Sequence, residues 1–129
     1  MPDVKLQTIP EGSLAIIAME NIRPLAESVD RYLAEWRKER EDAIGDEGIH
    51  FRGYQKDSYI LKTATPRFGS GEGKGQIMET VRGTDIYIMI DVLNWSITYS
   101  LNGVPNHMSP DDHYADLKRI INAICGKAN

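Results

Sequence analysis

Two short and almost wholly apolar runs most constrain what this chain can fold into. They cover residues 14–19 and 86–90. Neither run alternates between polar and apolar residues. The first is expected to be a strand covered on both faces, as in a parallel sheet with helices on either side, and the second a buried strand of a parallel sheet. Residues 59–64 resume strand character before Pro66 ends the run. Because helical patterns separate these runs, we expect residues 1–129 to form a single α/β domain.

The segment after the first run has the period of an amphipathic helix. Asn21 is a suitable N-cap for it. The charged residues 37–41 are expected to be solvated surface, and residues 42–57 a polar connecting loop. The apolar positions recur on one helical face, and we expect them to form its buried stripe: Leu25, Val29, Tyr32, Leu33 and Trp36.

A second helix is predicted near the carboxyl end. Ser109 can cap it, Pro110 suits its first position, and Asp112 stands where a capping box requires an acid. Gly126 is expected to end the helix. Cys125, the only cysteine, is expected to be an inert thiol in the core. The predicted buried stripe consists of His113, Leu117, Ile120, Ile121 and Ile124.

Two histidines and two aspartates cluster around the start of that helix. Side chains of these types bind metals. The aspartates are also the residues expected at a helix start, where capping and the positive end of the helix dipole favour them. Capping explains them more simply, so we predict no metal site. The four residues are His107, Asp111, Asp112 and His113.

A glycine-dense stretch lies within residues 67–91. Converging backbone N–H groups in such a loop can bind an anion. Two nucleotide-binding motifs do not fit, because Phe68 replaces the first glycine of a P-loop and Lys74 replaces the third glycine of the dinucleotide fingerprint. Lys74 is placed to reach a phosphate or, alternatively, to act as solubilising charge. The glycines are Gly69, Gly71, Gly73 and Gly75.

Composition excludes several classes of protein. The chain has 129 residues, a net charge of -4 and a pI near 5.3, which argues against a general nucleic-acid binder with a basic surface. No run approaches the roughly 18 apolar residues of a membrane span, and the amino terminus has no apolar signal-peptide core. We therefore expect a cytoplasmic protein without a nucleic-acid or membrane partner.

The residues after the second apolar run leave several roles open. Asp91 lies where a parallel strand presents side chains at its carboxyl edge, so it is either a ligand contact or a cap for its own loop. Residues 92–107 form a connection longer than the median loop. A lid, a subunit contact or a small hairpin would each explain its length.

The order of motifs from the glycine-dense stretch onward is specific. The sequence RFGSGEG at residues 67–73 is followed by ETVRGTD at residues 79–85 and then by the apolar strand. This order and spacing resemble the amino-terminal domain of the ribose-phosphate pyrophosphokinases, or phosphoribosyl pyrophosphate synthetases, whose signature is close to R-F-x-D-G-E and then E-S-V-R-G-x-D. Residues 14–33 resemble the first strand, turn and helix of that domain, and residues 116–124 resemble a later helix.

The resemblance implies an α/β fold with a Rossmann-like parallel sheet flanked by helices, the amino-terminal half of a type I phosphoribosyltransferase-like fold. On this comparison the chain is an amino-terminal fragment of a longer synthetase, truncated after its second main helix, and is expected to be inactive alone. The implied parent reaction transfers the β,γ-diphosphoryl group of ATP to ribose 5-phosphate, with Mg²⁺ bound to the triphosphate, and yields phosphoribosyl pyrophosphate and AMP. A homo-oligomer is implied as well.

The resemblance also implies roles for four residues. Phe68 resembles the aromatic residue that stacks on the adenine of ATP bound to a neighbouring subunit, and Glu72 resembles the acid that contacts the same base. Ser70 stands where the family usually has aspartate, and its hydroxyl lacks the charge that strengthens a hydrogen bond. Arg82 resembles the arginine of a regulatory phosphate or nucleotide pocket between subunits. No catalytic or metal-binding residue carries over.

Each of these roles has a plain structural alternative. Phe68 can be a core anchor, and Arg82 can pair with Glu79 or Asp85 in a salt bridge. The domain as a whole also has an alternative function. Ser70 and the long connection favour a non-catalytic regulatory or nucleotide-sensing module associated with a synthetase.

Overall fold

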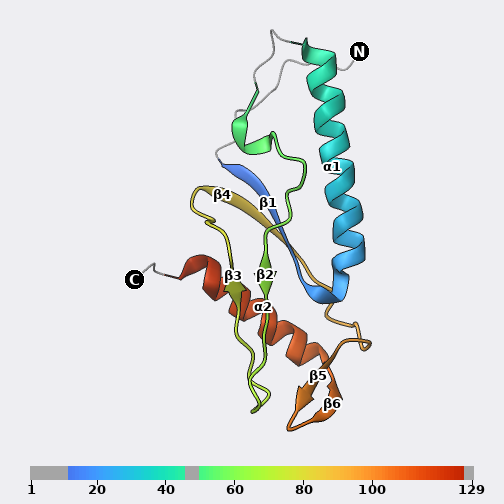
Figure 1. The fold of residues 1–129 in the computed structure, drawn as a ribbon, viewed down its shortest axis with the longest axis vertical. Helices are drawn as coiled ribbons and strands as arrows, with labels where there is room; N and C mark the ends of the chain where they lie inside the picture. Colours follow the sequence, from blue (N-terminus) through green and yellow to red (C-terminus); the bar gives the residue numbers. More distant parts are fainter. Residues whose placement is uncertain (1–11, 46–49, 127–129) are drawn as a thin grey trace.

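A computed structural model describes residues 12–45 and 50–126 of the chain. Two parallel strands lie at its centre, with a long helix beside them and a second helix near the carboxyl end (Figure 1). The elements, in chain order, are β1 (Ser13–Ala18), the 3-10 turn η1 (Glu20–Ile22), α1 (Arg23–Ile44), the 3-10 turn η3 (Arg52–Tyr54), β2 (Thr63–Ala64), β3 (Gln76–Ile77), β4 (Thr84–Met89), β5 (Thr98–Leu101), β6 (Val104–His107) and α2 (Pro110–Cys125).

The two apolar runs form the parallel pair that the sequence predicts. The expectation that the second run is a buried strand is wrong, since no residue of β4 is fully buried and Tyr87 is 64% exposed. In the described part of the chain β4 pairs with β1 alone, so it lies at the edge of the sheet. β1 and β4 run side by side, with Ser13 opposite Thr84 and Ala18 opposite Met89. On the other edge of β1, the amide of Ile16 donates to the carbonyl of Tyr59 at 2.7 Å. The predicted third strand is thus only partly formed, since Ile60 makes an isolated parallel bridge to Ile16 and β2 begins later.

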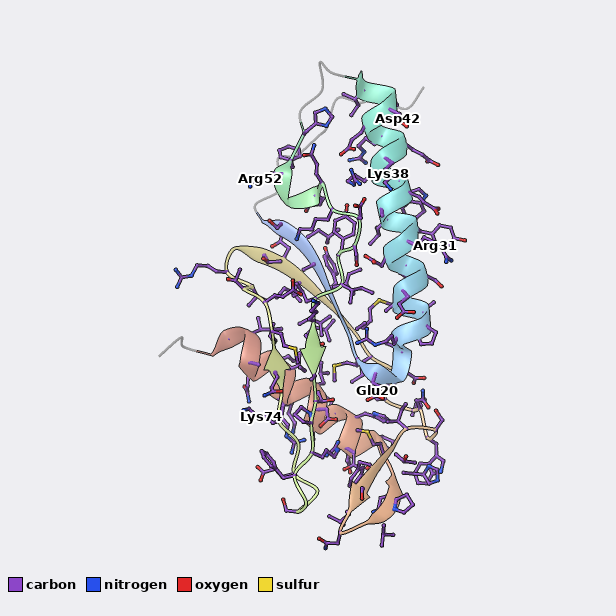
Figure 2. All side chains as sticks on the ribbon, viewed as in Figure 1. Glu20, Arg31, Lys38, Asp42, Arg52 and Lys74 are labelled. Atoms are coloured by element: carbon purple, nitrogen blue, oxygen red, sulfur yellow. The ribbon has the colours of Figure 1, made fainter. Side chains whose placement is uncertain are left out.

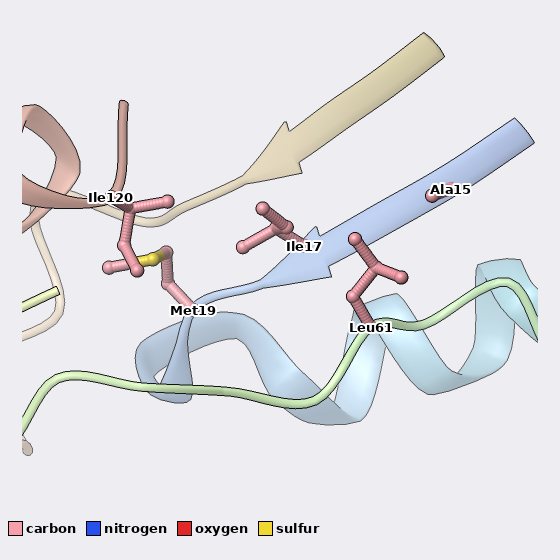
Figure 3. Packing of buried hydrophobic residues seen from close by; sticks show 5 residues of the cluster. All are labelled: Ala15, Ile17, Met19, Leu61 and Ile120. Carbon is pink, nitrogen blue, oxygen red and sulfur yellow. The ribbon is translucent and has the colours of Figure 1, made fainter. Parts of the chain in front are cut away.

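Both faces of β1 are buried, which is why its sequence shows no polar alternation. Side chains on one face pack with α2, and the cluster on that face consists of Ala15, Ile17, Met19, Leu61 and Ile120 (Figure 3). On the other face Ile16 packs with Ala34 of α1 and with Tyr59. The two helices therefore cover opposite faces of the sheet, and the predicted α/β architecture with flanking helices is confirmed.

The orientation of α1 differs from the prediction. The helix begins at Arg23 without a side-chain cap, because Asn21 lies in η1 and its amide bonds elsewhere. Its buried face is formed by Ala26, Asp30 and Ala34. Val29 and Leu33 are partly buried as predicted, whereas Leu25, Tyr32 and Trp36 are more than half exposed.

A buried carboxylate explains this orientation of α1. Asp30 accepts a hydrogen bond from the amide of Tyr59 at 2.6 Å and another from the hydroxyl of Ser58 at 2.7 Å. An unpaired buried carboxylate would be costly, so these bonds fix the rotation of the helix. The flanking alanines then allow the helix to lie close to the sheet. Arg31 projects from α1 on the side away from the sheet (Figure 2).

The charged run and the predicted loop also differ in part. α1 continues to Ile44, so the loop expected from residue 42 starts later, and residues 46–49 of it lie outside the described residues. Arg37 is largely buried and pairs with Glu41 at 2.7 Å, although the run was expected to be solvated. The hydrogen bond to Glu41 raises the pKa of Arg37 above its ordinary value.

Within the described residues, no helix has the length and apolar character needed to cross a membrane.

The start of α2 forms as predicted. The hydroxyl of Ser109 accepts from the amide of Asp112 at 3.2 Å, and the Asp112 carboxylate accepts from the amide of Ser109 at 2.9 Å. Pro110 occupies the first turn, and the helix ends at Cys125, immediately before Gly126. A reciprocal capping box of this kind is a local motif, so the sequence alone is sufficient to specify it.

The buried stripe of α2 is narrower than predicted. His113 and Ile120 are buried as expected, and Asp116 joins them on the same face. Ile121 and Cys125 are exposed, so the prediction that Cys125 is a core thiol is wrong. Ile121 follows the buried Ile120, and Cys125 follows Ile124, which packs partly buried against the same cluster. The next position on a helix turns by about 100°, which directs these two side chains away from the sheet.

The long connection of residues 92–107 contains a hairpin, one of the three explanations left open. β5 and β6 pair in antiparallel fashion, with Leu101 opposite Val104. Asn102 and Gly103 form the turn between them with positive φ angles of 51° and 81°. Asn-Gly favours this turn because both central residues of a type I′ turn need positive φ.

Tyr59 is expected to make the stability of the domain depend on pH in the alkaline range. Its ring is buried, its hydroxyl donates to the carbonyl of Tyr54, and burial raises its pKa above the ordinary value of about 10. The unfolded chain therefore loses the phenolic proton first. Stability from this group is fully present below pH 10 and falls as the pH rises through the folded-state pKa. We expect urea unfolding to show a smaller loss of stability between pH 9 and pH 11 in Tyr59→Phe than in the wild type.

The exposed Tyr32 offers a matched control for this effect. Tyr32→Phe is expected to lose as much stability over the same pH range as the wild type does. Equal losses in Tyr59→Phe and the wild type would contradict the prediction.

Candidate functional site

The glycine-dense stretch forms a β-hairpin, called here the Gly-rich hairpin (residues 62–78). β2 and β3 are its paired base, and the same register continues to an isolated bridge between Arg67 and Gly73. At the tip, the amide of Phe68 donates to the carbonyl of Glu72 at 2.8 Å, and the amide of Gly71 donates to the carbonyl of Phe68 at 2.9 Å. Gly71 has a φ of 87°, the left-handed conformation that closes a three-residue hairpin loop.

The tip brings together the three residues for which the sequence resemblance implies a contact with ATP. Phe68 and Glu72 are paired across the hairpin, so their side chains project from the same face. Phe68 is 56% exposed, which makes the core-anchor alternative wrong. Ser70 lies between them in the turn and is exposed, as is Glu72. The tip thus presents an aromatic ring, a hydroxyl and a carboxylate to the outside of the domain.

Arg67 ties this tip to α2. Its guanidinium donates to the carbonyl of Gly71 at 2.9 Å and to the carboxylate of Asp116 at 2.9 Å. The side chains of Arg67 and Asp116 are 9% and 5% exposed. Asp116 also accepts from Arg119 at 3.0 Å. A planar guanidinium can hold two acceptors in fixed directions, so Arg67 fixes the tip relative to the helix.

Two of the glycines have a packing role that the sequence did not reveal. A Cβ atom on Gly75 would lie 2.6 Å from the carbonyl oxygen of Arg119, and one on Gly73 would lie 2.9 Å from the carboxylate of Asp116. Of the four glycines only Gly71 has a positive φ. These glycines therefore allow a tight turn at Gly71 and a close approach to α2 at Gly73 and Gly75. These roles explain them better than an anion-binding nest does. Lys74 lies between the tip of the hairpin and β3 and is exposed (Figure 2).

Arg82 lies away from the tip. It is exposed in the turn that the amide of Thr84 closes onto Val81, just before β4. Figure 1 shows the start of β4 beside the central sheet, well above the hairpin tip at the lower end of the domain. Among the described residues no ion pair joins Arg82 to Glu79 or Asp85, so the predicted salt-bridge alternative is not formed. The Glu79 carboxylate instead accepts from a backbone amide at 2.6 Å.

A buried polar network lies at the carboxyl edge of the sheet, and sequence reasoning missed it. The side-chain oxygen Oδ1 of Asn21 accepts from the backbone N–H of Asp91 at 3.2 Å, and Asn21 Nδ2 donates to the backbone carbonyl of Asp91 at 2.7 Å. These two bonds fix the orientation of the Asn21 side-chain amide. Asn21 Nδ2 also lies 2.9 Å from His113 Nδ1. His113 Nε2 lies 2.7 Å from the carbonyl of Asn94. The donors and acceptors match only the neutral Nε2–H tautomer of His113.

The hydrogen bonds in this region show what Asp91 does, which the sequence left open as a ligand contact or a loop cap, and where the two histidines bond. The Asp91 carboxylate accepts from the amide of Leu93 at 3.0 Å, so it caps its own loop. Both ring nitrogens of His113 have protein partners, and His107 Nδ1 lies 2.7 Å from the carbonyl of Trp95. In the described part of the chain no three His, Cys, Asp or Glu side chains gather where a metal could bind. The one sign of this network in the sequence was Asn21, a polar residue three positions after the end of the buried strand β1.

A cavity beside this network is too small for a nucleotide. It is lined by Asn21, Thr65, His113 and Asp116, among others, and has about 20 Å³ of space, which is enough for a water molecule. The described residues around the tip of the Gly-rich hairpin do not enclose a ligand by themselves. Any ligand held by Phe68 would need further contacts from outside these described residues.

Comparison with known proteins identifies the family. No curated protein and no solved structure gives a significant match to the chain. The family model described as the N-terminal domain of ribose phosphate pyrophosphokinase matches residues 14–128, which include both helices, the sheet and the Gly-rich hairpin. With the parallel sheet between two helices and the signature on the hairpin tip, this match shows that the chain belongs to the family of ribose phosphate pyrophosphokinase N-terminal domains.

Proposed function

We propose that this domain supplies the adenine-contacting side of an ATP site in a ribose-phosphate pyrophosphokinase. A neighbouring copy of the protein completes the site with the groups that hold ribose and phosphates. The reaction of the parent enzyme would transfer the β,γ-diphosphoryl group of ATP to ribose 5-phosphate. The domain alone contributes binding and subunit contacts and no catalytic residue.

The exposed Phe68 is the observation that carries the proposal. An aromatic ring contributes most when its surface is buried, yet this ring is 56% exposed on a turn that Arg67 fixes to α2. A rigid exposed ring is a suitable platform for a nucleobase, because stacking needs a fixed face and little else. Glu72 projects from the same face of the hairpin and can accept from the exocyclic amino group of adenine.

The one-sided geometry supports completion by another copy. The tip projects from the domain, and the neighbouring cavity has room only for water. Arg82 lies in the turn before β4, away from the tip of the Gly-rich hairpin. Its proposed contact with a regulatory phosphate or nucleotide would therefore belong to a different pocket of the assembly. The described residues do not offer a donor set for a resident metal, so we assign no step to one. Mg²⁺ would arrive bound to the phosphates of ATP, as is usual for this ion.

Ser70 favours a second candidate, a nucleotide-sensing or regulatory module associated with a synthetase. Its hydroxyl lies exposed in the turn at the position where the family usually carries aspartate. A neutral acceptor forms a hydrogen bond roughly half as strong as a charged one, which suits weaker or altered recognition of the base. The rest of the parent chain separates the two candidates. The resemblance implies that catalysis depends on an Arg-Gln-Asp segment and on an acidic Asp-Asp motif that binds ribose phosphate, so their presence in the parent chain would favour catalysis and their loss would favour regulation.

Replacing Phe68 by alanine is expected to weaken ATP binding by about 5- to 150-fold, because base–aromatic stacking contributes roughly 1–3 kcal/mol. The measurement is calorimetric titration of ATP and ADP, with Mg²⁺, into the wild type and Phe68→Ala at protein concentrations that populate dimers. Both nucleotides share the adenine, so both should lose affinity to a similar degree.

Trp95 provides the matched control, since it is an equally exposed aromatic residue outside the Gly-rich hairpin. Trp95→Ala should bind ATP as the wild type does. The proposal would be contradicted if Phe68→Ala bound ATP as tightly as the wild type, or if Phe68→Ala and Trp95→Ala lost ATP affinity equally. If the wild type binds no nucleotide, release of AMP from ATP and ribose 5-phosphate by the longest parent chain is the deciding assay.

A further inference from the structure

The β5–β6 hairpin leans against the tip of the Gly-rich hairpin. The guanidinium carbon of Arg67 lies 4.5 Å from the ring centroid of Tyr99 in β5. A Cβ atom on Gly71 would lie 3.1 Å from Leu101 Cδ1 and 3.7 Å from Tyr99 Cε2. The two hairpins are about thirty residues apart in sequence, and they also lie close together at the lower end of the domain in Figure 1.

The tip needs support from outside its own hairpin. Its paired base is only two residues long on each strand, and a short two-stranded hairpin is marginally stable in water. Glycines at 69, 71 and 73 add chain entropy that folding must overcome. Phe68 is more than half exposed, so its side chain gives the tip little packing in return. The contacts through Arg67 are therefore the main restraint on the tip.

Tyr99 strengthens that restraint in two ways. Its ring face attracts the guanidinium directly as a cation–π pair, an interaction worth more when the cation is desolvated. It also covers Arg67, whose side chain is only 9% exposed. Removing water lowers the local dielectric and strengthens the hydrogen bonds from Arg67 to Gly71 and Asp116. Without the ring, water would compete for both bonds.

We propose that the β5–β6 hairpin is a buttress for the adenine-contacting tip, with Tyr99 as a positioning residue that acts through Arg67. Its ring holds the guanidinium between the Gly71 carbonyl and the Asp116 carboxylate, and so it fixes where Phe68 and Glu72 project. The consequence for nucleotide binding rests on the proposed function above. The mechanical role of Tyr99 does not.

Amide hydrogen exchange of the 129-residue chain tests the buttress without any nucleotide. The reporters are the amides of Phe68, Gly71 and Lys74, which bond to carbonyls within the hairpin. In Tyr99→Leu we expect their protection factors to fall about tenfold, because the cation–π contact and the shielding of Arg67 are both lost. Tyr99→Phe keeps the ring and should stay within about threefold of the wild type at these amides.

Two controls separate positioning from general stability. The amides of Ile16 and Leu61, which pair across the central sheet, should be unchanged in Tyr99→Leu. Trp95→Leu removes an aromatic residue that stacks on His107, and it should leave all the reporters unchanged. An equal fall at the sheet amides would show a merely structural role and overturn the proposal. It would also fail if Tyr99→Phe behaved like Tyr99→Leu, or if neither variant changed the reporters.

Nucleotide titration then tests the functional consequence separately. If the wild type binds ATP, Tyr99→Leu should bind it more weakly and Tyr99→Phe should match the wild type. If the wild type binds no ATP, the proposed adenine site fails while the exchange data still decide the buttress. Unchanged exchange in Tyr99→Leu combined with normal ATP binding would retain the site and reject the buttress.

Discussion

Replacing Asp116 by alanine is expected to lower the free energy of unfolding by about 3–5 kcal/mol, the cost of breaking a buried ion pair from one side. The carboxylate accepts from Arg67 at 2.9 Å and from Arg119 at 3.0 Å. After the substitution the guanidinium of Arg67 would stay in a largely buried site without its counter-charge. Urea unfolding at pH 7, followed by far-ultraviolet circular dichroism, measures the change.

Two further variants show whether the unpaired charge is the cause. Arg119→Met removes the more exposed partner of Asp116, at 30% exposure, and should cost less than about 1 kcal/mol. The double variant Arg67→Met with Asp116→Leu removes both buried charges and should recover much of the stability lost in Asp116→Ala. The interpretation is wrong if the double variant is as unstable as the single one, or if Asp116→Ala costs less than Arg119→Met.

Replacing Gly75 by alanine is expected to destabilise the domain by about 3 kcal/mol, the upper end of the range for overpacking. The new methyl group would lie 2.6 Å from the carbonyl oxygen of Arg119, 2.7 Å from its carbonyl carbon and 2.9 Å from the amide nitrogen of Ile120. These are backbone atoms of α2 and cannot rotate away, so the hairpin and the helix would have to separate. Urea unfolding measures this change as well.

Gly69 is the matched control in the same stretch. A Cβ atom there would meet no other heavy atom within 4 Å, and its φ is not positive. Gly69→Ala should therefore change stability by no more than about 0.5 kcal/mol. Equal destabilisation by the two substitutions would mean that chain flexibility, and not the approach to α2, explains the glycines. That outcome would also weaken the case for a fixed hairpin tip.

These two substitutions act on the same contact from opposite sides. Asp116 holds the tip of the Gly-rich hairpin through Arg67, and Gly75 lets the base of the hairpin lie against the backbone of α2. α2 thus serves as the platform for the proposed adenine-contacting tip. Both variants should also weaken ATP binding if the proposed function is right, because each loosens the support of Phe68.

The sequence predicted the parts of the candidate site that belong to a motif. Residues 67–72 showed the signature, and the structure places Phe68 and Glu72 side by side on an exposed tip. The sequence did not predict that Arg67 reaches Asp116, 49 residues away, or that Tyr99 covers it. No local pattern marks either partner, because neither contact depends on spacing along the chain. The assigned roles of Phe68, Ser70, Glu72 and Arg82 in binding remain predictions.

The sequence by itself determined the local elements of this protein. An apolar run without alternation specified β1, which is buried on both faces, and Ser109 and Asp112 specified the start of α2. Asn102 with Gly103 favours the turn that the structure shows, although a hairpin was one of three explanations that the sequence left open. Each of these signals involves residues within about four positions of one another, and short-range hydrogen bonds or burial of a single segment are enough to make them decisive.

Only the tertiary structure decided how those elements face one another. α1 turned its alanines toward the sheet, and left Tyr32 and Trp36 exposed, because Asp30 bonds to Tyr59 across 29 residues. His113 and Asn21 became a buried pair because the carboxyl edge of the sheet brought them together. A buried polar group must find a partner wherever the fold supplies one, and that requirement outweighs the apolar periodicity from which a helix face is predicted.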